Sequence, residues 1–145
     1  MITKNGSRLF GQGRIMYPQS VSLVNKNGDN SSVSISNLNG DISKYGLYVG
    51  SGTTSPTLDD IDLENELTSS VLSGSELTWA ASGYGNVVFT RSFTNTTNEN
   101  VIVSEIALYA RATSPSCLLA REVFSTPRTI APNETVTFSF EIAFN

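Results

Sequence analysis

Five carboxylates crowd into residues 57–67 and have side chains suited to metal binding or acid catalysis: Asp59, Asp60, Asp62, Glu64 and Glu66. Acidic residues at alternate positions bind calcium in EF-hand loops, but a loop that starts at Asp60 also needs Gly at position 65 and Glu at position 71. The chain has Asn65 and Val71 instead. The spacing is also too regular along one helix face to identify a glycosidase pair. We therefore expect the solvated face of a short acidic helix, with Thr57 as N-cap and Asp60 at the capping-box position.

A glycine-rich stretch, Gly50-Ser51-Gly52-Thr53-Thr54-Ser55-Pro56, superficially resembles a phosphate-binding loop. A dinucleotide-binding fingerprint requires a third small residue that opens a helix, and here Ser55 is followed by Pro56. A P-loop requires Gly-Lys-Ser/Thr, and this stretch has no lysine. We expect its glycines to allow a tight turn at the end of a strand over residues 45–49.

The residues of nucleophilic catalysis are largely missing. The sequence contains no histidine, which removes the commonest general base and the commonest metal ligand. The single cysteine, Cys117, has no identifiable activating base, so an inert thiol is expected, and neither an intrachain disulfide nor a cysteine zinc site can form. Most hydrolase arrangements are thereby excluded, and we expect no catalytic residue, no metal and no cofactor.

Composition sets further bounds. Nine basic and thirteen acidic residues give a net charge of -4 and a pI near 4.7, which is the wrong sign for a protein that binds a nucleic-acid backbone. No apolar run is long enough for a signal peptide core or a bilayer span, so we expect a soluble protein made in a cytoplasm. Charged residues are only 15% of the chain while Ser, Thr, Asn and Gly are abundant, which is typical of β-rich proteins.

Residues 86–112 predict two strands joined by a polar loop over residues 95–100. Pairing Thr94 with Val101 would align the apolar sets of both strands, so we predict a hairpin in this register. Arg91 would then lie on the apolar face, where it reaches a partner chain, extends to the sheet edge or forms an ion pair. A bulge near Ser104 would bring it to Glu105.

The flanking residues predict further strands. A second hairpin is expected around the turn at residues 25–30, and short strands are expected near Leu72 and Leu77. Residues 117–124 predict a strand in which Arg121 and Glu122 indicate an edge or interface position. The final strand, residues 135–145, places five large apolar side chains on one face, which requires a partner sheet: Val136, Phe138, Phe140, Ile142 and Phe144.

Two other features indicate binding. Residues 1–14 carry Lys4, Arg8 and Arg14 without an acidic residue, which indicates a flexible basic arm that either orders on an acidic neighbouring subunit or is a frayed terminus. Trp79 and Tyr84 could stack on a sugar ring, although a lone tryptophan in a β-domain is more often part of the core.

Four short stretches carry a resemblance to a known family. They are residues 48–56 with a glycine-threonine turn, residues 59–67 with the core LENEL, residues 104–109 and residues 118–121. The set resembles small virion proteins of tailed bacteriophages, which carry such a turn, a LENEL-like helix and an E-x-G-L-x strand. The resemblance covers about residues 45–144, and Ala107 stands where the family pattern has glycine.

The resemblance implies an all-β fold: an antiparallel β-sandwich, jelly-roll or immunoglobulin-like, of about eight strands with one short helix. We expect residues 1–14 to be the arm and residues 15–145 to be one domain. The implied function is a non-enzymatic structural role in the virion, in capsid decoration or in the tail or connector, for a protein made in the host cytoplasm.

The expected partners are copies of the chain itself and capsid, portal or tail proteins, but not nucleic acid or membrane. The basic arm and the acidic segment are the two candidate surfaces, and the arm of one copy could dock on the helix of the next. The alternative is a carbohydrate-binding or receptor-binding module of a phage fibre, with Trp79 and Tyr84 as its platform.

Overall fold

A computed structural model describes residues 1–5, 20–34, 42–82, 86–111 and 114–143. Extended backbone dominates them, as the abundance of β-branched, aromatic and hydroxyl residues predicts. A short 3-10 turn, η2 (Ile42–Lys44), precedes β3. The strands are β1 (Ser20–Val24), β2 (Asn30–Ser34), β3 (Tyr45–Gly50), β4 (Leu72–Gly74), β5 (Thr78–Ser82), β6 (Asn86–Asn95), β7 (Val101–Ala110), β8 (Cys117–Ile130) and β9 (Thr135–Ala143).

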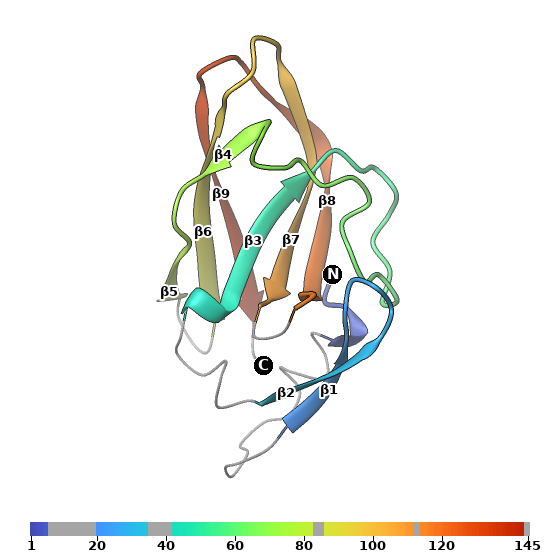
Figure 1. Ribbon diagram of the computed structural model, residues 1–145. Helices are drawn as coiled ribbons and strands as arrows, with labels where there is room; N and C mark the ends of the chain where they lie inside the picture. The colour runs from blue at the N-terminus through green and yellow to red at the C-terminus, as the bar shows by residue number, and fades with distance from the viewer. Residues whose placement is uncertain (6–19, 35–41, 83–85, 112–113, 144–145) are drawn as a thin grey trace.

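The strands form antiparallel sheets, which confirms the predicted fold class at this level. One sheet has the order β3-β7-β8. In the other, β4 and β5 both pair with β6 on one side while β9 pairs with it on the other. Figure 1 shows β9 passing behind β3 and β7, so the two sheets face each other as layers. The third, separate sheet is the hairpin of β1 and β2.

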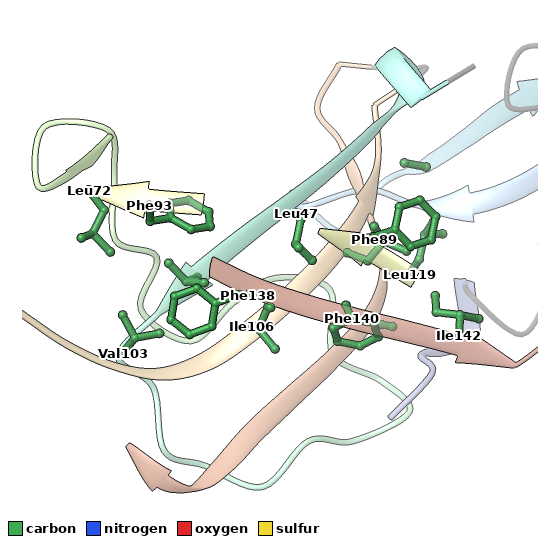
Figure 2. Close-up of a cluster of buried hydrophobic side chains, with 14 of the residues drawn as sticks. Leu47, Leu72, Phe89, Phe93, Val103, Ile106, Leu119, Phe138, Phe140 and Ile142 are labelled. Carbon is green, nitrogen blue, oxygen red and sulfur yellow. The ribbon is translucent and has the colours of Figure 1, made fainter. Parts of the chain in front are cut away.

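The core lies between the two larger sheets (Figure 2). Leu47 and Leu108 enter it from one sheet, and Phe89 and Phe140 enter it from the other. Burying each such side chain stabilises the fold by roughly 1.5 to 3 kcal/mol. The alternation predicted for the last strand is confirmed for its described part, because Phe138, Phe140 and Ile142 are all buried; Phe144 lies outside the described residues.

The hairpin predicted from residues 86–112 is wrong, although both of its strands exist. β6 pairs with β4, β5 and β9, whereas β7 pairs with β3 and β8, so the loop between β6 and β7 crosses from one sheet to the other. Buried Asn95 fixes this crossing: its Oδ1 accepts the Thr97 N–H, and its Nδ2 donates to the Ile130 carbonyl at 2.8 Å. A strand buries one face in either topology, so alternation alone could not separate them.

A bulge occurs at Ser104, but it lies between β7 and β8 and not in the hairpin for which the sequence suggested it. Val103 pairs with Arg128 and Glu105 with Val123, so residues 124–127 oppose Ser104 alone. After this shift the other set of alternate side chains in β7 faces the core. Ile102 is therefore 55% exposed, while Ile106 is buried.

Of the alternatives for Arg91, extension to a sheet edge is confirmed, and the ion pair with Glu105 does not form. The Arg91 guanidinium donates instead to the carbonyl oxygens of Ser75 at 2.8 Å and Leu47 at 2.9 Å. It also lies about 5 Å from the ring centroids of Tyr48 and Phe93. Arg91 thus reaches from β6 to the edge of β3 and ties the two sheets together.

The hairpin of β1 and β2 is confirmed. Val24 pairs with Asn30, and the Asn25 side chain accepts the N–H groups of Asn27 and Asp29 at 2.9 and 3.1 Å. Gly28 has a φ of 87°, which favours glycine at that position of the turn.

Candidate functional site

Residues 51–67, the acidic loop, do not form the predicted helix: they consist of turns and bends. Half of the capping box forms, since Asp60 accepts the Thr57 N–H at 3.0 Å, but the Thr57 hydroxyl donates to Asp60 at 2.7 Å instead of accepting its N–H. Further along, however, tertiary acceptors take the N–H groups that a helix would need. Leu63 donates to the Tyr109 hydroxyl, and Glu64 donates to the carboxylate of Glu105. The tertiary bonds therefore override the local helix signal.

An ion cluster, made of buried Arg121 and Glu105, partly buried Asp60 and exposed Glu64, holds this loop against the sheet. Arg121 is 3% exposed, and its Nε lies 2.8 Å from Glu105 Oε2 on the neighbouring strand. Its Nη1 lies 2.9 Å from Asp60, and its Nη2 lies 3.5 Å from Glu64. β8 is an edge strand of its sheet, which confirms the edge alternative predicted for this segment, and the acidic loop covers Arg121 there.

Glu105 is completely buried and fully bonded. Its Oε1 accepts the N–H groups of Gly52 at 3.0 Å and Asn65 at 2.8 Å. Its Oε2 accepts the N–H of Glu64 at 3.1 Å together with Arg121 Nε. A charge is tolerated at such a position only when paired and hydrogen-bonded, and four donors meet that requirement here.

A smaller apolar cluster lies next to these ions on the outer face of the β3-β7-β8 sheet: Leu63, Ala107, Tyr109 and Leu118, with Tyr48 packed beside them. The Tyr109 hydroxyl donates to Asp62 at 2.6 Å, and Lys26 lies 3.2 Å from the same carboxylate. Burial and the neighbouring Asp62 raise the pKa of Tyr109 well above its usual range. The phenol therefore stays protonated and anchors the loop as a donor.

The same contacts shift the pKa of two loop carboxylates. Burial opposes ionisation of Asp60, but hydrogen bonds from Thr57 and the charge of Arg121 outweigh it and lower the pKa of Asp60. Hydrogen bonds from Thr54 to Glu64 likewise lower the pKa of Glu64. Both groups bind protons less readily in the folded state than in the unfolded chain.

Acid should therefore weaken the protein through this cluster. The stabilisation is fully present above the ordinary pKa values of 3.8 for Asp60 and 4.5 for Glu64, and it is lost as the pH falls through the lower values of the folded state. We expect urea unfolding midpoints to be level from pH 7 to pH 5 and to fall below about pH 4.5. The Asp60→Asn variant should show a shallower fall, and equal slopes for the two proteins would contradict this assignment.

The described residues among the predicted interaction residues have charge partners within the same chain. Lys4 pairs with Asp59, while Asp62 and Glu66 both lie near Lys26. Residues 1–5 belong to the fold, because Thr3 N–H donates to the Leu119 carbonyl at 2.9 Å. Arg8, Arg14 and Tyr84 lie outside the described residues. No group of three or more acidic or cysteine side chains in the described part of the chain is arranged to hold a metal ion.

Two further expectations have clear outcomes. Trp79 is 46% exposed on β5, so the expectation that it belongs to the core is wrong. Cys117 is completely buried.

A cavity of about 170 Å³ lies where the first residues meet the acidic loop, lined by Lys4, Asn5, Val24, Leu58, Asp59, Asp60 and Ile61.

The sequence reasoning missed Glu105 and Arg121 as a pair. The available signal was Glu105 as the one charge in the segment IVSEIALYA and Arg121, followed by Glu122, in the otherwise apolar segment CLLAREVF. The turn predicted for the glycine-rich stretch also leaves out a second reason for its glycines, which is close packing. A Cβ on Gly50 would lie 2.3 Å from Glu105 Oε1, so glycine is required there by close approach of the buried carboxylate.

No helix among the described residues combines the length and the apolar character that a bilayer span requires. Comparison of the chain with protein-family models, with characterised proteins and with solved structures finds no match.

Proposed function

We propose that this chain is a non-enzymatic structural protein of a tailed-bacteriophage virion, decorating the capsid or belonging to the tail or connector. In this proposal the two sheets form a β-sandwich of the jelly-roll or immunoglobulin-like type. The protein acts by contact with its own copies and with other virion proteins. The proposal starts from the resemblance of four sequence stretches to such proteins.

The observation that carries it is that these four stretches, which lie in two separate parts of the sequence, residues 48–67 and 104–121, contact one another. Arg121, from the last stretch, binds Glu105, from the third. Glu105 in turn accepts N–H groups from Gly52 and Glu64, which belong to the first and second. Short motifs that meet at one cluster form a single structural unit, and chance similarities scattered along the chain have no reason to meet.

The unit has a mechanical role that suits a virion subunit. The ion cluster fixes an irregular loop without helix or strand structure onto the outer face of a sheet. A surface that is rigid before it meets its partner loses less conformational entropy on binding. Many symmetric copies then multiply weak contacts into a stable shell or tube.

Two measurements test the proposal. Light scattering after size exclusion, across a wide concentration range, should give a discrete oligomer with a closed symmetry. A tagged copy supplied during phage infection should also co-purify with the tailed particles. Absence of the tag from particles that are otherwise complete would contradict the virion role, whatever the oligomeric state.

The exposure of Trp79 favours one second candidate, a carbohydrate-binding or receptor-binding module of a phage fibre. Nearly half of this side chain is accessible, and an accessible indole can stack on a sugar ring. Glycan binding that is lost in Trp79→Ala, with the fold preserved, would favour this candidate over assembly.

A further inference from the structure

β9 has one edge that pairs with no described strand, whereas the outer edges of β8 and β3 each receive a contact from another part of the chain. Residues 1–3 run along β8, with a bridge between Ile2 and Ala120. Arg91 caps the Leu47 carbonyl on the edge of β3. Within the described residues, β9 pairs only with β6, over a continuous register of nine residues without a bulge.

The hydrogen bonds of β6 show which backbone groups of β9 point to the open edge. Ser92 exchanges bonds with Ser75, through its N–H to the Ser75 hydroxyl and through its carbonyl to the Ser75 N–H, so its backbone faces away from β9. Directly opposite residues of an antiparallel pair either both face each other or both face away. Thr137, the partner of Ser92, therefore turns its N–H and carbonyl outward, and Thr135 and Ser139 do the same by alternation.

This edge lacks the usual protection against strand addition. Natural edge strands carry lysines, prolines, bulges or a covering segment. Between Thr135 and Ala143 the sequence is TVTFSFEIA, with no lysine or proline and with one charged residue, Glu141, near its end. The side chains of Thr135, Thr137 and Ser139 are small and exposed. Their hydroxyl groups form hydrogen bonds with those of Thr94, Ser92 and Thr90 on β6, at 2.7, 2.7 and 3.3 Å. The outer face of the sheet therefore carries hydroxyl groups up to the open edge.

We propose that β9 pairs edge to edge with β9 of a second copy, antiparallel, about a two-fold axis at Ser139. Ser139 is the middle residue of the nine, and its backbone points outward, so complete overlap and correct hydrogen bonding occur in the same register. The pairing joins the two β6-β9 sheets into one continuous sheet. It rests on the proposed function only in taking a second copy as the partner.

The strand sequence is self-complementary in this register, which favours a second copy over an unrelated strand. On the inner face the order is Val136, Phe138, Phe140, Ile142, so Phe138 would lie opposite the partner's Phe140 and Val136 opposite the partner's Ile142. Aromatic pairs and β-branched pairs are the combinations that stabilise antiparallel neighbours. A two-fold axis requires the same surface on both copies, and this strand supplies it.

Charge at the axis tests the inference. In Ser139→Lys, two lysines would face each other across the axis with their Cα atoms about 5.5 Å apart, and like charges directly opposite destabilise a strand pair. We expect the dissociation constant of the dimer, from light scattering or analytical ultracentrifugation, to rise at least tenfold. Ser139→Glu should have the same effect. An equimolar mixture of the two variants should dimerise within a few-fold of the wild type, because opposite charges then meet.

Thr90→Lys is the matched control. It adds the same charge on the same face and removes the same contact between Thr90 and Ser139, but it lies on the central strand. It should dimerise as the wild type does.

Two results would overturn the inference. If the wild-type protein is monomeric at every concentration, β9 does not pair and the inference is wrong. The virion role is then tested by co-purification with particles alone. A wild-type oligomer that Ser139→Lys does not weaken means that self-contact uses another surface, and the proposed function survives without this interface.

Discussion

Glu105→Gln should lower the free energy of unfolding by about 3 to 5 kcal/mol, the range for breaking a buried ion pair by changing one partner. The substitution keeps the volume of the side chain but removes its charge and half of its acceptor capacity. An amide oxygen at the Oε1 position could still accept Gly52 and Asn65. The amide nitrogen would then face two donors, the N–H of Glu64 and the Nε–H of Arg121. Either orientation of the amide leaves buried donors unpaired.

Urea unfolding at pH 7 measures this effect, with Glu99→Gln as the matched control. Glu99 is exposed, so its substitution should stay within about 0.5 kcal/mol of the wild type. The double variant Glu105→Gln with Arg121→Met should be more stable than the sum of the single losses predicts, because it removes both buried charges together. Additive losses would mean that the two side chains do not act as a pair.

The elements that the sequence predicted well are those set by local pattern. The alternation of Val136, Phe138, Phe140 and Ile142 specifies a strand whatever lies opposite. The Asn and Gly residues around Gly28 specify a turn whose left-handed position glycine fills.

Strand pairing was predicted less well, because it depends on contacts that no local pattern records. The polar loop after β6 has the composition of a hairpin loop. Its path is decided by Asn95, whose side chain holds the Ile130 carbonyl 35 positions further along the chain. The same loop composition serves a hairpin or a crossing between sheets, and only the tertiary acceptor separates them.

The candidate site could be predicted in its residue types but not in its roles. The carboxylates of residues 59–66 were recognised as a group, and of the predicted capping box the bond from the Thr57 N–H to Asp60 forms. Their counter-charges are Lys4, Lys26 and Arg121, which come from three other segments. Each of these five carboxylates therefore has a cation of its own chain within 4 Å, although five negative charges share three positive ones, and Lys4 contacts the loop of its own chain.

Gly50→Ala should cost about 3 kcal/mol, at the upper end of the range for overpacking. The added methyl group would lie 2.3 Å from Glu105 Oε1 and 2.5 Å from the Asn65 carbonyl oxygen. Neither atom can move away at low cost, because the carboxylate is held by four donors and the carbonyl accepts the Ser51 N–H at 2.9 Å. The strain falls on the acidic loop, since the core of the two sheets does not include Gly50.

Hydrogen exchange separates this local effect from general unfolding. In Gly50→Ala, peptides that cover residues 51–67 should lose protection, because the N–H groups of Gly52, Glu64 and Asn65 depend on Glu105. Peptides from β6 and β9 should exchange only through global unfolding, so their protection should fall only as far as the global free energy of unfolding falls. Ser55→Ala, an exposed position in the same loop, should leave both regions unchanged. Equal loss of protection in β9 and in the loop would mean that the acidic loop and the core unfold as one unit, and that the ion cluster supports the whole fold rather than one surface of it.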